Sequence, residues 1–94
     1  MRVRAVPVRD EVQRFGESVV LHDGQVLHLS SIPTLVRSRA SVWTDLDDLL
    51  RAVEDVVGAG PDGSGRRILA EQVRELSQIG LVEVDGDAEV PPPT

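Results

Sequence analysis

Two short β-rich runs on either side of Asp23-Gly24 constrain the fold of this chain more than any other feature. The runs, Glu17–His22 and Gln25–Leu29, are rich in valine and leucine. Two such runs joined by Asp-Gly are the strongest short-range signal for a β-hairpin with a two-residue type I′ turn. That turn fixes the register of the hairpin and places Val20 opposite Leu27.

The predicted register distributes apolar side chains over both faces of the hairpin, because alternate residues of a strand point to opposite sides. One face receives Val20, Leu27 and Leu29, and the other receives Val19, Leu21, Val26 and His28. Neither face is purely polar. Either the N-terminal segment covers the second face or that face stays partly open, and we expect the segment to cover it.

The N-terminal segment itself predicts an irregular strand. Val3, Val8 and Val12 are separated by Pro7 and by the charged residues 9–11. Proline is confined to the edges and ends of strands, and a charged interruption suggests a break. We therefore expect an N-terminal three-stranded antiparallel sheet made of this strand and the hairpin.

Three helices are expected after the hairpin. Ser30 and Pro33 predict the first, over residues 32–39, since serine caps a helix and proline is tolerated in its first turn. The second starts with Thr44-Asp-Leu-Asp47, which resembles a capping box, and ends at Gly58. Its apolar face is periodic and comprises Leu46, Leu49, Leu50, Val53, Val56 and Val57.

The third helix follows a connection that is rich in glycine and proline, residues 58–65, which we expect to be flexible. Ser64 is its predicted cap and Gly80 its end, and residues 81–84 then form a short extended segment that packs back on the domain. Residues 1–84 therefore form one α+β domain. The acidic, proline-rich residues 85–94 are expected to be a disordered tail.

Composition excludes several function classes. The chain has no cysteine, ten basic residues against sixteen acidic ones, and a formal net charge of −6. A thiolate metal site and a cysteine nucleophile are therefore excluded, and an acidic chain repels nucleic acid and anionic membrane surfaces. The longest stretch without Asp, Glu or Arg, Gly24–Val36, is shorter than the roughly 20 residues that span a bilayer. We expect a cytoplasmic protein that does not enter the membrane.

No catalytic or metal-binding constellation emerges from the sequence. His22 and His28 fall on opposite faces of the hairpin, and neither has a second histidine or a carboxylate pair beside it. Ser30 and Ser31 suit helix capping, and the chain has no nucleophile elbow. The glycine-rich residues 58–65 lack the lysine of a phosphate-binding loop and follow a helix. We expect no enzymatic activity, no cofactor and no metal.

The third helix carries the densest group of basic residues, Arg66, Arg67 and Arg74. Arg67, Glu71 and Arg74 form a row at helical spacing. Such a row is either a solvated face with internal ion pairs or a surface for an acidic partner.

The order of these elements resembles the PqqD-like family, the peptide chaperones also called RiPP precursor peptide recognition elements, which have a winged helix-turn-helix fold. The matching segments are Val19–Ser30, the hairpin that leads into the first helix, Thr44–Leu50, the capped start of the second helix, and Leu69–Val82, the third helix with its Gly-Leu ending. The resemblance covers roughly residues 12–84. The chain departs from the family pattern at two places, at Ser38–Trp43, which replaces an Asp-Gly turn, and in the loop before the third helix, which carries extra glycine.

The resemblance implies a non-catalytic domain that binds the leader of a ribosomally synthesised precursor peptide and presents it to a modifying enzyme. The leader adds as an antiparallel strand beside the third strand and rests against the third helix. Carried over by position, the third strand supplies Gln25, Val26, Leu27, His28 and Leu29, and the helix supplies Arg67, Glu71 and Arg74.

The resemblance also implies the partners. They are the leader peptide and a maturation enzyme, which is a radical SAM enzyme, a lasso-type protease and cyclase pair, or another maturase. The domain itself is expected to be a monomer or a weak homodimer.

Two other readings remain open. A winged-helix module could bind DNA, but the net charge opposes this, and the wing tip Asp23-Gly24 has no basic residue to follow the backbone. A protein-interaction or dimerisation module without peptide recognition is the third possibility.

Overall fold

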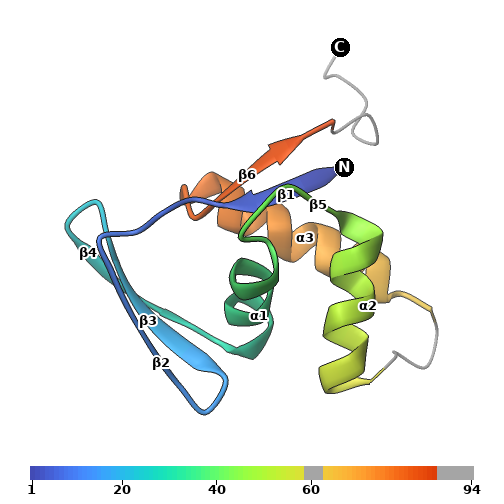
Figure 1. Cartoon of the computed structure of the whole chain (residues 1–94), viewed down its shortest axis with the longest axis horizontal. Coiled ribbons are helices and arrows are strands. Elements are labelled where there is room, and N and C mark those ends of the chain that lie inside the picture. Colours follow the sequence, from blue (N-terminus) through green and yellow to red (C-terminus); the bar gives the residue numbers. More distant parts are fainter. Residues whose placement is uncertain (59–62, 87–94) are drawn as a thin grey trace.

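Two separate three-stranded antiparallel sheets flank a group of three helices (Figure 1). The computed structural model describes residues 1–58 and 63–86. It shows the expected small α+β domain with an N-terminal three-stranded antiparallel sheet and three helices, and it adds a second sheet that was not expected. The predicted flexible connection and tail lie largely outside the described residues.

The first sheet, which we call the hairpin sheet, contains β2 (Asp10–Arg14), β3 (Glu17–His22) and β4 (Gln25–Leu29) in that order. Its register confirms the predicted hairpin, with Val20 opposite Leu27. The turn residues Asp23 and Gly24 have φ angles of 51° and 74°, and a type I′ turn requires positive values at both positions.

The second sheet contains β1 (Arg2–Ala5), β5 (Thr44–Asp45) and β6 (Val82–Asp85), with β1 in the centre. The N-terminal segment does break, but at residues 6–9 and so earlier than the expected 9–11, and its two halves belong to different sheets. The segment after the third helix packs back on the domain, as predicted, because β6 pairs with β1 along its whole length.

The helices are α1 (Ser31–Arg39), α2 (Leu46–Val57) and α3 (Gly65–Gln78). Ser30 occupies the predicted cap position of α1, but its side chain makes no capping hydrogen bond. The predicted capping box of α2 is wrong, because Asp45 holds the cap position. Thr44 lies in β5 opposite Val3, and its hydroxyl donates to the carbonyl of Val42 at 2.8 Å.

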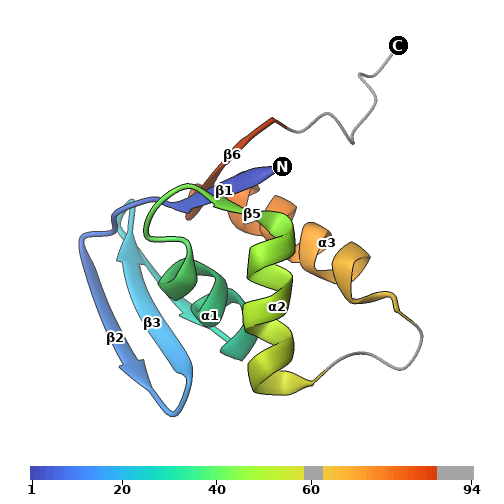
Figure 2. The same ribbon diagram turned by 45° about the vertical axis from the view of Figure 1, so that its right-hand side comes forward.

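One apolar core joins the two sheets and the three helices, and Figure 2 shows how these elements lie around one another. Its fully buried members come from every layer and include Val3, Val20, Val36, Leu46, Leu49, Val73 and Leu81. The apolar face of α2 enters this core only in its first two turns. Val56 and Val57, predicted to continue that face, are 62% and 51% exposed.

Arg37, on the buried side of α1, makes hydrogen bonds at the junction between the two sheets. Its guanidinium donates to the carboxylate of Glu11 at 2.6 Å, to the carbonyl of Val6 at 2.7 Å and to the carbonyl of Leu81 at 3.3 Å. The side chain of Arg37 is only 6% exposed. These bonds connect α1 to β2, to the segment between β1 and β2, and to the turn before β6.

Candidate functional site

Strand β4 forms an edge of the hairpin sheet. Within residues 1–58 and 63–86 it pairs with β3 and with no other strand. An edge strand presents a row of unpaired N–H and C=O groups, and a further strand can pair with them. This is the edge that the sequence resemblance singles out.

The register identifies which backbone groups face outward. A two-residue turn makes the flanking residues, His22 and Gln25, a hydrogen-bonded pair, and such pairs alternate with non-hydrogen-bonded ones along the hairpin. The N–H and C=O groups of Leu27 therefore point to β3, and those of Val26 and His28 point to the open edge. The amide of Arg9 donates to the carbonyl of Leu21 at 3.1 Å, on the β2 side, which fits this alternation.

The open edge has no lysine, no proline and no bulge, three features that prevent further pairing in many natural edge strands. The sequence Gln-Val-Leu-His-Leu of β4 has no lysine and no proline, and its pairing with β3 is continuous from Gln25 to Leu29. The edge is therefore open to another extended segment.

The side chains of β4 alternate between two environments. Leu29 is buried and Leu27 half-buried on the inner face, whereas Val26 is 72% exposed on the outer face. His28 also lies on the outer face, where Nε2 is 2.7 Å from a carboxylate oxygen of Glu17 on β3. An added strand would thus meet an apolar inner side and a mixed outer side.

The end of β4 is held firmly against α1. The hydroxyl of Thr34 donates to the carbonyl of Leu29 at 3.2 Å and lies 2.9 Å from the hydroxyl of Ser18. Ser18 and Thr34 are both buried, so these polar groups satisfy one another inside the core. The edge is consequently presented on a rigid support.

Helix α3 meets the elements on either side of β4 at two points, one on β3 and one on α1. Its C-terminal end lies by the hairpin turn, since a Cβ at Gly80 would be 3.1 Å from Nε2 of His22. Near its start, Ile68 shares an apolar groove with Ile32, which follows β4 by three residues. The main contacts of α3, however, are with β6, α2 and α1.

The predicted selector residues of α3 lie together, but on another flank of the helix. Arg67 and Arg74 line a shallow basic depression with Arg66 and Ala70. Arg66 donates to the carboxylate of Asp47 at 3.0 Å. This flank of α3 therefore faces the start of α2. The flank with Ile68 faces α1 and the second half of α2 instead.

Glu71 belongs to the predicted row through its contact with Arg67. Its carboxylate is 3.6 Å from Nη1 of Arg67, and both side chains are more than half exposed. An exposed pair of this kind contributes little to stability, at most about 1 kcal/mol. Both side chains can therefore change partners at small cost.

The two histidines lie on opposite faces of the hairpin, as predicted. His28 pairs with Glu17 on the outer face, and His22 lies beside Gly80. Across the described part of the chain, no three side chains of His, Cys, Asp or Glu are grouped closely enough to hold a metal ion.

The outer face of the hairpin sheet is open, which corrects the expectation that the N-terminal strand covers it. Val12 and Val19 form a cross-strand pair on this face and are 56% and 43% exposed. The N-terminal strand extends the sheet sideways as β2, because its backbone pairs with the free edge of β3. It therefore adds apolar surface to the face.

Arg37 is the residue that sequence reasoning missed. A basic residue on a short helix suggests a solvent-exposed side chain, yet Arg37 is buried. The available signal was spacing, because Pro33, Val36, Arg37 and Ala40 fall on one helical face and all four are buried.

Among residues 1–58 and 63–86, no helix has the length and apolar character that crossing a membrane requires. Comparisons with protein-family models, curated proteins and solved structures found no match for this chain.

Proposed function

We propose that this domain binds the leader of a ribosomally synthesised precursor peptide as an added strand on β4 and presents it to a modifying enzyme. In this proposal the domain is a PqqD-like module with a winged helix-turn-helix arrangement, in which the β3–β4 hairpin is the wing. It acts by binding and has no catalytic role.

One observation carries the proposal, namely the open and unprotected edge of β4. Val26 and His28 direct their backbone groups outward, and no lysine, proline or bulge protects the strand. Strand addition on such an edge takes affinity from main-chain hydrogen bonds and specificity from alternate side chains.

The length of the edge limits what the backbone can contribute. Two outward residues offer two N–H and two C=O groups, hence four hydrogen bonds. At about 0.5–1.5 kcal/mol each, these bonds contribute roughly 2–6 kcal/mol before the cost of ordering the peptide. Side-chain contacts must supply the rest.

Two surfaces beside β4 are suited to supply those contacts. The apolar groove of Ile32 and Ile68 lies just beyond the end of β4 and would accept an aliphatic side chain. The depression of Arg67 and Arg74 lies on the next flank of α3 and would accept acidic residues of the leader beyond its paired strand. In the free protein the carboxylate of Glu71 partly neutralises the positive charge of Arg67.

The proposal is tested by N-methylating the peptide at single positions. Candidate leaders come from short reading frames beside the gene, and each is titrated into the labelled protein. If the leader pairs with β4, methyl groups on alternate residues, those whose N–H faces β4, abolish binding, and methyl groups on the residues between them leave it nearly unchanged. Equal tolerance of all positions would reject strand addition.

A further inference from the structure

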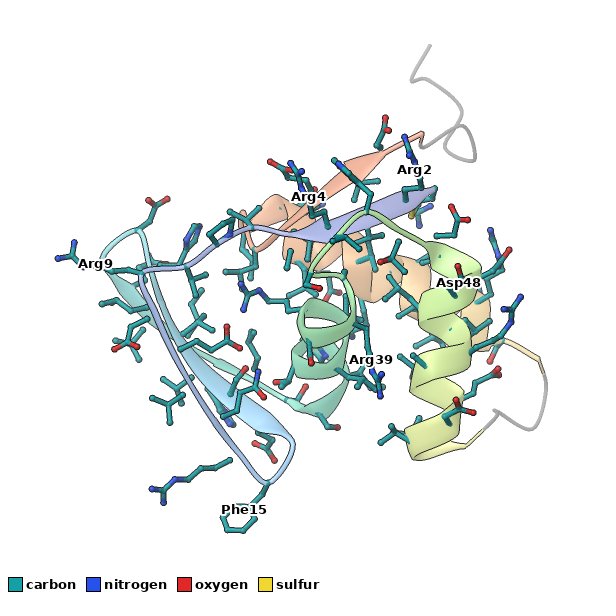
Figure 3. The ribbon with its side chains drawn as sticks, in the orientation of Figure 1. Arg2, Arg4, Arg9, Phe15, Arg39 and Asp48 are labelled. Carbon is teal, nitrogen blue, oxygen red and sulfur yellow. The ribbon has the colours of Figure 1, made fainter. Side chains whose placement is uncertain are left out.

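The β2–β3 turn displays an aromatic side chain in a conformation that such residues rarely adopt. Phe15 has a φ angle of 54° and its side chain is fully exposed. Figure 3 shows the ring pointing away from the ribbon at the tip of the hairpin. Positive φ is uncommon outside glycine and is an outlier for a bulky residue.

A second hairpin turn in the same chain can be compared with this one. The β3–β4 hairpin has the same two-residue geometry, with φ of 51° at Asp23, a residue type that tolerates the left-handed conformation. Neither strain nor exposure of Phe15 helps the fold, since the ring contributes nothing to the buried core. An exposed aromatic anchor of this kind is typical of an interaction surface.

A hollow that suits this ring lies beside the same turn. It is an open hollow of about 160 Å³, lined by Gly16 of the turn and by Leu35, Val56 and Val57 on α1 and α2, with the polar residues Gln13, Ser31, Thr34 and Ser38 completing its wall. A cavity of about 150 Å³ can hold a benzene-sized ring. The two valines are the ones that leave the core at the end of α2 and are more than half exposed.

We propose that two copies of the chain associate around a two-fold axis beside this turn, with Phe15 of each copy inserted into the hollow of the other. Because Gly16 lines the hollow, ring and hollow lie side by side, and such an axis exchanges them. The contact is isologous and closes after two copies.

The charges around the two surfaces are complementary. Arg14 precedes Phe15 at the tip, and Asp55 directly precedes the valines of the hollow, whereas Glu54 lines the groove toward α3. Insertion of the ring therefore brings a basic residue of one copy toward an acidic helix end of the other, which favours this pairing over a tip-to-tip contact. The edge of β4 is not used, so the association leaves the proposed peptide site open.

Complementing variants test the proposal. Phe15→Asn removes the ring and suits positive φ, and Val57→Arg fills the hollow with a cation that favours a helix C-terminus. Each variant alone loses both contacts of the dimer. A mixture keeps one contact, because the ring of the Val57→Arg copy still enters the intact hollow of the Phe15→Asn copy.

Sedimentation velocity from micromolar to millimolar protein measures the outcome, with circular dichroism as a check on folding. We expect the wild type to dimerise and Phe15→Asn to raise the dimer dissociation constant at least about 100-fold, since two buried rings are lost. The equimolar mixture should associate about tenfold or more tightly than either variant. Val26→Thr, on the other face of the hairpin sheet, should match the wild type.

Three results would overturn the proposal. They are a wild type that stays monomeric at millimolar concentration, a Phe15→Asn variant that dimerises as the wild type does, and a mixture that associates no better than its components.

Discussion

Arg37 and Glu11 form the most buried ion pair of the described residues, with Nη1 and Oε1 2.6 Å apart. The pair connects α1 to the first strand of the hairpin sheet. Burial by itself raises the pKa of Glu11, but hydrogen bonds from Gln13 and Arg37 and the positive charge of Arg37 together hold that pKa below its ordinary value. The ionised carboxylate is therefore favoured in the folded state.

Glu11→Gln should destabilise the domain at neutral pH. The change leaves the buried guanidinium of Arg37 with its two carbonyl partners but without a counter-charge, which costs about 1–3 kcal/mol. Urea unfolding at pH 7 measures this loss. Glu75→Gln, the same chemical change at an exposed carboxylate of α3, serves as the control and should cost much less.

The same pair makes stability depend on pH in one direction. A lowered pKa in the folded state means that Glu11 contributes stability above its ordinary pKa of about 4.3 and loses that contribution as the pH falls through the folded value. The difference between wild type and Glu11→Gln should therefore shrink in acid. A constant difference between pH 7 and pH 3 would show that the ion pair is not its source.

Gly80→Ala should destabilise the domain for two separable reasons. Gly80 has a φ angle of 82°, and an added Cβ would lie 3.1 Å from the ring of His22. Left-handed conformations cost a non-glycine residue about 1–2 kcal/mol, and the close contact adds to this. His22→Ala should restore only the steric part, so the double variant remains less stable than His22→Ala alone in thermal unfolding.

Arg67→Glu combined with Arg74→Glu should weaken binding of an acidic leader, with circular dichroism as a check on folding because Arg74 is half-buried and its Nε is enclosed. The exposed pair of Arg67 with Glu71 contributes little to the fold. The binding free energy should weaken by about 1–3 kcal/mol if the two charges are partly desolvated at the contact, and by much less if they lie at its solvated rim. Isothermal titration gives the difference, and equal affinities would exclude the depression from the site.

Specific binding to duplex DNA is not expected. On α3, Arg66 is 3.0 Å from Asp47 and Arg67 is 3.6 Å from Glu71, so carboxylates already neutralise part of the basic surface. The net charge of −6 adds repulsion. A mobility-shift assay should find no tight complex even at low salt, and sequence-dependent nanomolar binding at physiological salt would contradict this expectation.

Local chemistry explains which parts of the fold the sequence predicted. The register of the β3–β4 hairpin follows from Asp23-Gly24, because a two-residue turn leaves one pairing possible. The end of α2 at Gly58, with a φ angle of 85°, follows from glycine alone. The edge at β4 was instead an expectation from the family resemblance, and the strand order of the hairpin sheet places β4 at an edge.

Long-range pairing explains what the sequence did not predict. Arg2 pairs with Asp85 across almost the whole chain, and no local signal assigns β1 to β6 instead of the hairpin. The same sheet recruits Thr44 as a strand residue opposite Val3 and so removes it from the predicted capping box. The burial of Arg37 likewise depends on carbonyls and a carboxylate that only the assembled fold brings together.

Amide hydrogen exchange along β4 is the most direct measure of strand addition. In the free protein the amides of Leu27 and Leu29 are bonded to β3 and should exchange slowly, whereas those of Val26 and His28 point outward and should exchange fast. A bound leader should slow Val26 and His28 and leave the other two nearly unchanged. Uniform slowing along β4, or protection confined to α1 and α2, would contradict docking of the leader on this edge.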